Sequence, residues 1–124
     1  MNIFYTNRNK ALYAVKQNGL DLRNVSLNLK EDREIVLAAV NNNGHALQYA
    51  LPGAKNDREI VLAAVKNKSS SLLYASPQLQ NDRNFILDAV SRNGFVIQYL
   101  SPEFRKDREI ILPAIYKFNI TLIN

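Results

Sequence analysis

The chain contains no cysteine, which excludes disulfide bonds, thiolate catalysis and zinc sites built from cysteine. Glycine and proline are scarce, with four of each among 124 residues, which argues against disorder and against collagen-like order. No apolar run approaches the roughly 20 residues that a membrane-spanning helix needs. The first eight residues lack the basic-then-apolar order of a secretory signal. These absences predict a single soluble domain over residues 1–124.

Residues that carry chemistry are also few. His45 is the only histidine, and without a second histidine or a cysteine we expect it to bind no metal. Its spacing does not place it beside a serine as a nucleophile–base pair, and there is no glycine-rich phosphate loop. Acidic pairs such as Asp57 and Glu59 recur along the chain, whereas an active site is normally built once. We therefore expect no catalytic residues, no cofactor and no metal.

What the chain does contain is a repeat of 25 residues. Each copy starts with an Asp-Arg pair, followed by an apolar run such as Ile60-Val61-Leu62-Ala63-Ala64-Val65. No gap is needed to align the copies. The units start near Asn7, Asp32, Asp57, Asp82 and Asp107; the first is divergent and the last is truncated in its second helix, at residues 120–124.

Each unit reads as two short helices and a turn. The first helix, of about 11 residues, begins at the Asp-Arg pair with either Asn56 or Asp57 as cap in the third unit, and it stops at Asn-Gly, where glycine tolerates a left-handed conformation. A second helix of about six residues ends before Ser-Pro or Leu-Pro. Helices this short are marginal alone. The sequence therefore predicts an all-α fold, a short α-solenoid of about five 25-residue two-helix repeats, with 3₁₀ turns allowed between units.

Substitutions between the copies predict which face is buried. A leucine is invariant at Leu62 and its equivalents, and an alanine is invariant at Ala64 and its equivalents, so we expect both positions to be buried and the alanines to permit close helix approach. Ala63 becomes Asp88 one unit later, which predicts a solvent-facing position. Pro113 lies inside the first helix of the last unit and is expected to bend or shorten it.

The unit Asn56-Asp57-Arg58-Glu59-Ile60-Val61-Leu62-Ala63-Ala64-Val65, with Asn-Gly, Leu-Gln-Tyr-Ala and Ser-Pro-x-Leu after it, resembles the helical repeat family called domain of unknown function 4116. The resemblance covers residues 7–124. Members occur in protist proteins and in bacteria that live inside protists, including Legionella-type pathogens with many secreted effectors. The resemblance thus implies a binding or scaffolding role, located in the cytoplasm or translocated into a host cell without a classical signal peptide. It carries no catalytic motif.

Two series of side chains recur every 25 residues and form the candidate interaction surface. The Arg ladder comprises Arg8, Arg33, Arg58, Arg83 and Arg108; the Tyr ladder comprises Tyr49, Tyr74 and Tyr99. The arginines could bind phosphate or an acidic peptide, but acidic residues recur with the same period, which favours pairing within or between units. The tyrosines could stack bases or hold a peptide, but packing is the more common role of such a series.

Sixteen basic residues against 11 acidic ones give a formal net charge of +5, which favours weak, salt-sensitive attraction to acidic surfaces. We interpret the chain as a non-catalytic module for protein–protein interaction or scaffolding, with an unknown protein as partner. The alternative is a helical-repeat nucleic-acid-binding protein that uses the Arg and Tyr ladders. Because the terminal units of a short solenoid expose apolar faces, end-to-end self-association is a further option.

Overall fold

The computed structural model describes residues 4–120, and within this range the chain is all-helical. The repeating elements are a ten- or eleven-residue α-helix, a six-residue 3₁₀ helix (labelled η) and a single turn that leads to the next unit. In chain order they are α1 (Arg8–Gln17), η1 (Gly19–Asn24), η2 (Leu29–Glu31), α2 (Arg33–Asn42), η3 (Gly44–Tyr49), α3 (Pro52–Lys55), α4 (Arg58–Asn67), η4 (Ser69–Tyr74), α5 (Pro77–Gln80), α6 (Arg83–Arg92), η5 (Gly94–Tyr99), α7 (Pro102–Arg105) and α8 (Arg108–Phe118).

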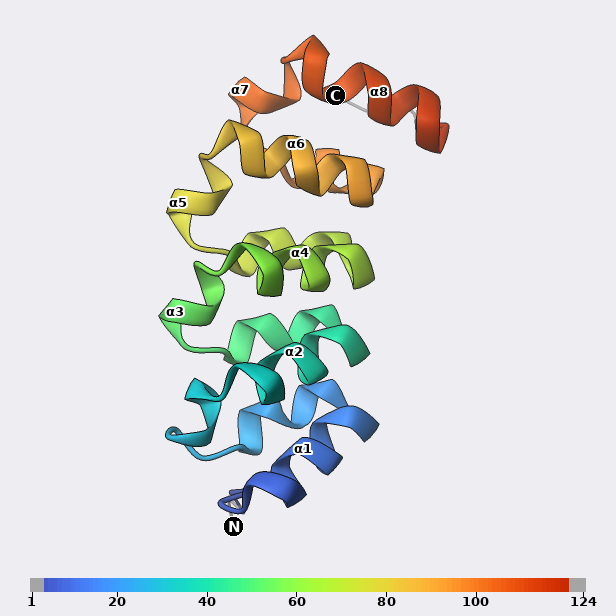
Figure 1. Cartoon of the computed structure of the whole chain (residues 1–124). Helices are drawn as coiled ribbons and strands as arrows, with labels where there is room; N and C mark the ends of the chain where they lie inside the picture. The colour runs from blue at the N-terminus through green and yellow to red at the C-terminus, as the bar shows by residue number, and fades with distance from the viewer. Residues whose placement is uncertain (1–3, 121–124) are drawn as a thin grey trace.

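The units stack in a row, as the sequence predicts (Figure 1). Helices α1, α2, α4, α6 and α8 form one layer in which each contacts the next, and η1, η3, η4 and η5 form a second, parallel layer. The single-turn helices α3, α5 and α7 lie along one edge (Figure 1). The two ends of the chain lie at opposite ends of the stack (Figure 1). The fold is therefore a ladder whose contacts run between neighbouring units.

An aspartate begins each of the long α-helices α2, α4, α6 and α8. The side chain of Asp57 accepts hydrogen bonds from the backbone N–H groups of Glu59 and Ile60, and Asp32 does the same for its own helix. Asn56 instead ends α3, so Asp57 is the cap. In the first unit Asn7 takes this role and accepts from the N–H of Lys10. The Asp of each Asp-Arg pair thus satisfies backbone donors at the helix start.

The second segment of each unit is a 3₁₀ helix, which the sequence placed only as an option between units. In η3, the side chain of Asn43 accepts a hydrogen bond from the N–H of His45 and starts the helix. The rise of about 2.0 Å per residue lets six residues span about 12 Å, against about 9 Å for an α-helix of that length. This longer rise lets a short segment return along most of the ten-residue α-helix before Pro52 starts the connecting turn.

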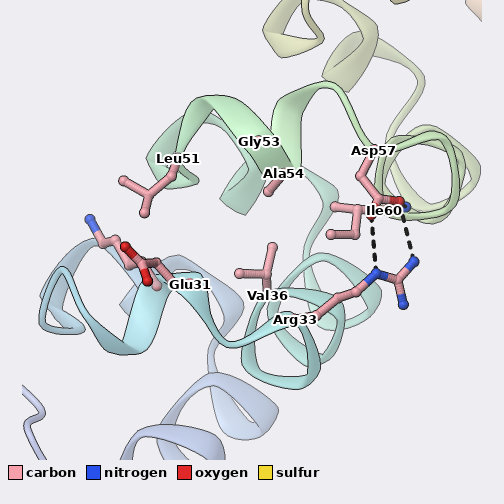
Figure 2. Close-up of a pocket in the computed structure, with 9 residues that line it drawn as sticks. Glu31, Arg33, Val36, Leu51, Gly53, Ala54, Asp57 and Ile60 are labelled. Atoms are coloured by element: carbon pink, nitrogen blue, oxygen red, sulfur yellow. Dashed lines mark hydrogen bonds and ion pairs between the residues drawn. The ribbon is translucent and has the colours of Figure 1, made fainter.

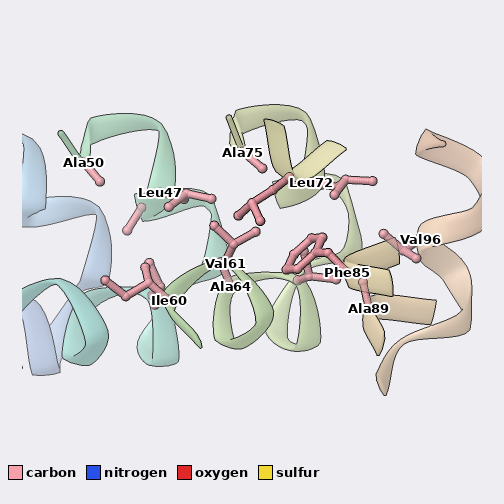
Figure 3. Close-up of a cluster of buried hydrophobic side chains, with 14 of the residues drawn as sticks. Leu47, Ala50, Ile60, Val61, Ala64, Leu72, Ala75, Phe85, Ala89 and Val96 are labelled. Atoms are coloured by element: carbon pink, nitrogen blue, oxygen red, sulfur yellow. The ribbon is translucent and has the colours of Figure 1, made fainter. Parts of the chain in front are cut away.

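The core is one continuous cluster between the two layers (Figure 3). Helices α2, α4 and α6 each contribute four buried residues to it, which in α4 are Ile60, Val61, Ala64 and Val65, all at most 2% exposed. Each six-residue 3₁₀ helix contributes a large apolar side chain, such as Leu72, which points into the cluster (Figure 3). The invariant alanines, Ala64 among them, are buried as predicted.

The sequence predicted that Leu62 is buried and that Ala63 faces solvent, and both predictions were wrong in part. Leu62 and its equivalents are only half-buried, at the margin of the core, and the deepest large positions are those of Ile60 and Val61. Ala63 is also half-buried and packs against the core edge, so it does not simply face solvent. The leucine is invariant in all five copies and yet only half-buried. Invariance among the copies therefore does not show how deeply a residue is buried.

The sequence analysis explained the glycine of each Asn-Gly pair by a left-handed backbone conformation, and this explanation was also wrong. No glycine among the described residues has a positive φ, and Asn43 before Gly44 is extended, with φ −149°. Glycine is required instead by close approach: a Cβ on Gly19 would collide with the carbonyl oxygen of Ala39, and a Cβ on Gly44 would collide with that of Ala64. The glycine therefore permits contact between successive units and does not make a turn.

The last described helix departs from the pattern at its end. Pro113 does not shorten α8, which at 11 residues is the longest α-helix described and ends at Asn119 in the left-handed conformation, with φ 52°. Proline near the middle of α8 removes one N–H donor without ending the helix. Most of the truncated second helix predicted for this unit, residues 121–124, lies outside the described residues.

Candidate interaction surface

The Arg ladder is an ion-pair network that connects neighbouring units. The guanidinium of Arg33 lies 3.0 Å from Asp57 (Nε to Oδ2) and 3.1 Å from Glu59 (Nη2 to Oε2), both at the start of the next unit's helix. Figure 2 shows this guanidinium beside Asp57, with dashed lines for two of its contacts. The same geometry recurs for Arg8 with Asp32 and Glu34, at 2.6 Å each. Both arginines therefore pair one unit along, which is one of the two pairings that the acidic period left open.

This pairing shifts the protonation of the carboxyl groups. The hydrogen bond from Arg33 holds the pKa of Asp57 below its ordinary value, and those from Arg8 and Arg83 do the same for Asp32 and Asp107. The pKa of each arginine is raised in return. The carboxylates already hold these guanidinium groups, which leaves fewer donors for a phosphate.

Arg58 has a different set of partners. At the helix start of the following unit, Asn84 takes the place of the glutamate found at the other boundaries. The second carboxylate that would pair with Arg58 there is therefore missing. The guanidinium lies 3.6 Å from Asp82 and 3.9 Å from Asp88, and it stacks over the ring of Phe85 at 5.4 Å from the centroid. Phe85 therefore replaces part of the lost charge pairing with a cation–π contact.

Arg108 is the last member of the Arg ladder. Within residues 4–120 no carboxylate lies within salt-bridge distance of it, because the unit that would supply the acidic pair is not among them. Its four equivalents each contact two carboxylates of the following unit or of its first helix.

The Tyr ladder is half-buried and packs against the core. Tyr49, Tyr74 and Tyr99 each end a 3₁₀ helix and contact core residues. Tyr74 also meets the ring of His45 edge-on, with centroids 6.4 Å apart. This placement favours a packing role for the tyrosine rings, with one edge left toward solvent.

A hollow of about 380 Å³ is lined by residues of the second unit, by the end of the first and by the start of the third (Figure 2). Val36, Ala54 and Ile60 form its apolar lining, and Arg33 with Asp57 closes one side. Lys30 lies at the rim, where partial burial lowers the pKa of its amine. The hollow has an apolar interior with charges of both signs around it.

The layer of 3₁₀ helices presents a second surface, which the sequence analysis did not identify. Side chains three apart in a 3₁₀ helix point the same way. One side of each 3₁₀ helix therefore carries two side chains that point the same way. We call this side of η3, η4 and η5 the 3₁₀ face; its residues are His45 and Gln48, Ser70 and Leu73, and Phe95 and Gln98. Leu73 is 56% exposed and Phe95 is 51% exposed. The residues just beneath, such as Leu47, Leu72 and Ile97, are fully buried and apolar.

The 3₁₀ face contains a serine–histidine contact that the spacing argument missed. His45 Nε2 lies 2.7 Å from Ser70 Oγ in the next unit. The two residues occupy equivalent positions 25 apart, which the stacking of η3 on η4 brings together. Gln48 donates to the carbonyl oxygen of His45 and fixes the local backbone. The separation of 25 residues, which places the two residues at equivalent positions in stacked units, was the sequence signal that could have predicted this contact.

A further inter-unit contact involves asparagines near the ends of α-helices. The side-chain oxygen of Asn67 accepts a 2.7 Å hydrogen bond from the N–H of Gly44 in the preceding unit, and its amide donates to the carbonyl of Asn41. Asn42 does the same for Gly19 and Lys16. The recurring separation of 23 between the glycine and the asparagine was the sequence signal for this pair of contacts.

The described part of the chain lacks two features. No helix within residues 4–120 is long and apolar enough to cross a membrane. Over the same range, no group of three or more His, Asp or Glu side chains is arranged to hold a metal ion.

The stacked helical units and their repeated inter-unit contacts define the chain as a helical-repeat protein. Comparison with known families then places it further. The profile of the family described as Domain of unknown function (DUF4116) matches residues 7–52, 55–80 and 82–122 in consecutive segments. The chain belongs to this family. No curated protein and no solved structure matches the chain significantly.

Proposed function

We propose that the chain is a non-catalytic module for protein–protein interaction or scaffolding, and that the 3₁₀ face is its contact surface. The observation that carries this proposal is the contrast within that face. Its outward positions change from unit to unit, from His45 to Ser70 to Phe95, while the position beneath, held by Leu47, Leu72 and Ile97, stays apolar and buried. A rigid backbone that presents variable side chains is how helical-repeat proteins recognise partners.

Exposed apolar side chains in adjacent units support the proposal. Leu73 and Phe95 project from the neighbouring helices η4 and η5, and both are more than half exposed. A single exposed apolar residue is ordinary, but neighbouring ones on a continuous surface are typical of a contact site. Gln98 and His45 add polar groups at the margin of this pair.

The Arg ladder gives less support to the nucleic-acid alternative. Arg8, Arg33 and Arg83 each hold two carboxylates, so a phosphate would have to displace them. The half-buried rings of the Tyr ladder offer little area for base stacking. The formal charge of +5 remains as a source of weak, salt-sensitive attraction.

The test is partner capture by proximity labelling in the natural source cell, with matched variants. Leu73→Glu/Phe95→Glu places two negative charges on the 3₁₀ face, and Tyr116→Glu places one negative charge at an 82% exposed aromatic on α8. We expect the double variant to lose enrichment of the partners and Tyr116→Glu to keep it. Equal enrichment by all three proteins would overturn the proposed surface.

A titration of the protein against single-stranded RNA and duplex DNA tests the nucleic-acid-binding alternative. We expect no binding at physiological salt. Binding with a steep salt dependence that Arg33→Gln weakens would favour the nucleic-acid function instead.

We propose further that the module acts in a host cell as a secreted effector or part of one. The support is the occurrence of the family in intracellular bacteria. Transfer of an enzyme-reporter fusion from the source cell into a host cell tests it, and a reporter signal confined to the source cell would contradict it.

A further inference from the structure

The hollow of about 380 Å³ lies where one unit departs from the repeat. Of the four turns between units within residues 4–120, three carry a large apolar side chain at the same position, namely Leu29, Leu79 and Phe104. The turn of the second unit has Ala54 there instead. Leu79 is buried in the core at 5% exposed, and the other two large residues pack against the core. The hollow is therefore space that a leucine-sized side chain fills at the other boundaries.

The lining of the hollow suits an apolar side chain. Figure 2 shows Ala54 between Leu51 and Ile60, with Val36 across the hollow from it. Pockets that bind small ligands range from about 300 to 1,000 Å³, and the hollow is at the lower end of this range, so it suits one side chain better than a large cofactor. Leu51 also makes the rim more apolar, because the other turns begin with a serine at its position: Ser26, Ser76 and Ser101.

The rim of the hollow carries a positive charge that the described chain does not pair. Lys30 is half-buried, and within residues 4–120 no carboxylate lies within salt-bridge distance of its amine. Partial burial lowers the pKa of this amine, because the charged form loses part of its hydration. Arg33 on the rim is already paired with Asp57, and Glu31 is exposed to water. A carboxylate that reaches the rim therefore finds its partner in Lys30.

We infer that the hollow binds a leucine or phenylalanine side chain of a partner protein, and that an acidic residue next to it in the partner's sequence pairs with Lys30. This inference rests on the proposed interaction function and adds a second contact site, because the hollow and the 3₁₀ face share no residue. Leu79 in the equivalent space indicates the size of the bound side chain, and the unpaired amine indicates the charge beside it.

A second copy of this chain does not have the required sequence. The bound segment needs an exposed leucine or phenylalanine with an acidic neighbour. The leucines and phenylalanines exposed within residues 4–120 all lack an acidic residue on either side in the sequence; they are Phe4, Leu27, Leu73 and Phe95. The partner is therefore a different protein.

The first experiment fills the hollow from within the chain. Ala54→Leu supplies the side chain that Leu79 supplies one unit later, so we expect it to raise the Tm. Gln78→Leu is the matched control, because it adds the same side chain at an exposed position of α5, outside the hollow, and should leave the Tm nearly unchanged. A lower Tm in Ala54→Leu would show that the space does not accept a leucine and would overturn the inference.

The second experiment selects the partner's sequence. A random peptide library displayed on phage is selected on the full wild-type chain, and single peptides are then titrated by fluorescence anisotropy. We expect the selected peptides to carry Leu or Phe beside Asp or Glu. Ala54→Leu should bind them about tenfold more weakly or worse, because the apolar side chain can no longer be buried, whereas Gln78→Leu should bind them like wild type. Lys30→Met should weaken binding about twofold to fivefold at low salt and less at high salt.

Three results would overturn the inference. The selection yields no binding peptide; the selected peptides bind folded Ala54→Leu as tightly as wild type, or bind Lys30→Met equally well at low salt; or wild type forms a dimer that Ala54→Leu abolishes, which would assign the hollow to a second copy. Circular dichroism establishes that the variants are folded. Leu73→Glu/Phe95→Glu should bind the selected peptides normally, so failure of either proposal leaves the other untouched.

Discussion

The carbonyl oxygen of Ala64 occupies the space that a Cβ on Gly44 would need. The two residues lie in successive units, and their approach sets how closely η3 packs on α4. Gly44 has an ordinary negative φ, so its requirement comes from the neighbouring unit and not from its own backbone. This contact leads to the first of four predictions on stability.

Gly44→Ala should destabilise the protein by about 1–3 kcal/mol, the usual cost of overpacking. The collision is with backbone, which cannot rotate away as a side chain can. Gly53→Ala is the matched control, since a Cβ there meets nothing within 4 Å and the residue is exposed in α3. It should be neutral or stabilising by up to about 1 kcal/mol. Urea unfolding measures both, and equal effects would contradict the packing argument.

Ser71→Ala should stabilise the protein by about 1 kcal/mol. Its hydroxyl is fully buried without a hydrogen-bond partner among the described residues, and the equivalent residue one unit earlier is Ala46. Removing it ends the cost of an unsatisfied polar group. Ser70→Ala, its neighbour in η4, should act oppositely and cost about 0.5–1.5 kcal/mol, because it breaks the 2.7 Å contact with His45. Thermal unfolding compares the two, and a loss of stability in both would count against the first.

Asn67→Ala should cost about 1–3 kcal/mol, because the buried N–H of Gly44 then loses its acceptor. Asn41→Ala, at an exposed position near the end of α2, should change the free energy of unfolding by less than about 0.5 kcal/mol. Hydrogen exchange at the Gly44 amide gives a local readout, and we expect it to accelerate only in Asn67→Ala. Unchanged exchange there would show that the inter-unit bond has no role in stability.

Stability should fall in acid because of the Arg ladder. The folded pKa values of Asp32, Asp57 and Asp107 lie below the unfolded value of about 3.9. Their contribution is complete above that value and is lost as pH falls through the folded pKa. NMR titration should give Asp57 a low pKa in wild type and a higher one in Arg33→Gln.

The difference in Tm between wild type and Arg33→Gln should accordingly shrink as pH falls from about 5 toward 2. Arg23→Gln, which removes an exposed arginine outside the Arg ladder, serves as the control and should leave the pKa of Asp57 unchanged. A difference in Tm that stays constant across this range would rule out the ion pair as its cause.

Much of the fold could be read from the 25-residue period, because each unit repeats its own helix signals. The caps illustrate this: Asp57 begins its helix through short-range hydrogen bonds that any helix start needs. The shared period of acids and arginines also predicted that Arg33 pairs with a carboxylate, but it left open whether that carboxylate lies in the same unit or in the next one. Local signals of this kind depend on neighbours in the sequence.

Other features were beyond the sequence because they depend on how units pack. Leu62 and Val61 are both apolar, and the way the neighbouring units pack decides that Val61 is buried and Leu62 is only half-buried. The contact between His45 and Ser70 exists because η3 stacks on η4 in register. The sequence predicted the Arg and Tyr ladders as the interaction surface, whereas the packing of the units pairs the arginines and leaves the 3₁₀ face exposed.

The sequence by itself determined the number of units, their helical nature and the recurrence of acids and arginines at their helix starts, whereas the structure decided the cap and the partner of each arginine. The tertiary structure alone decided that the second segment is a 3₁₀ helix, why glycine is required at residues 19 and 44, and which apolar side chains remain exposed. The physical reason is the range of the interactions. Capping and periodicity act within a few residues, whereas close approach and burial depend on the distance between units that the chain joins only after folding.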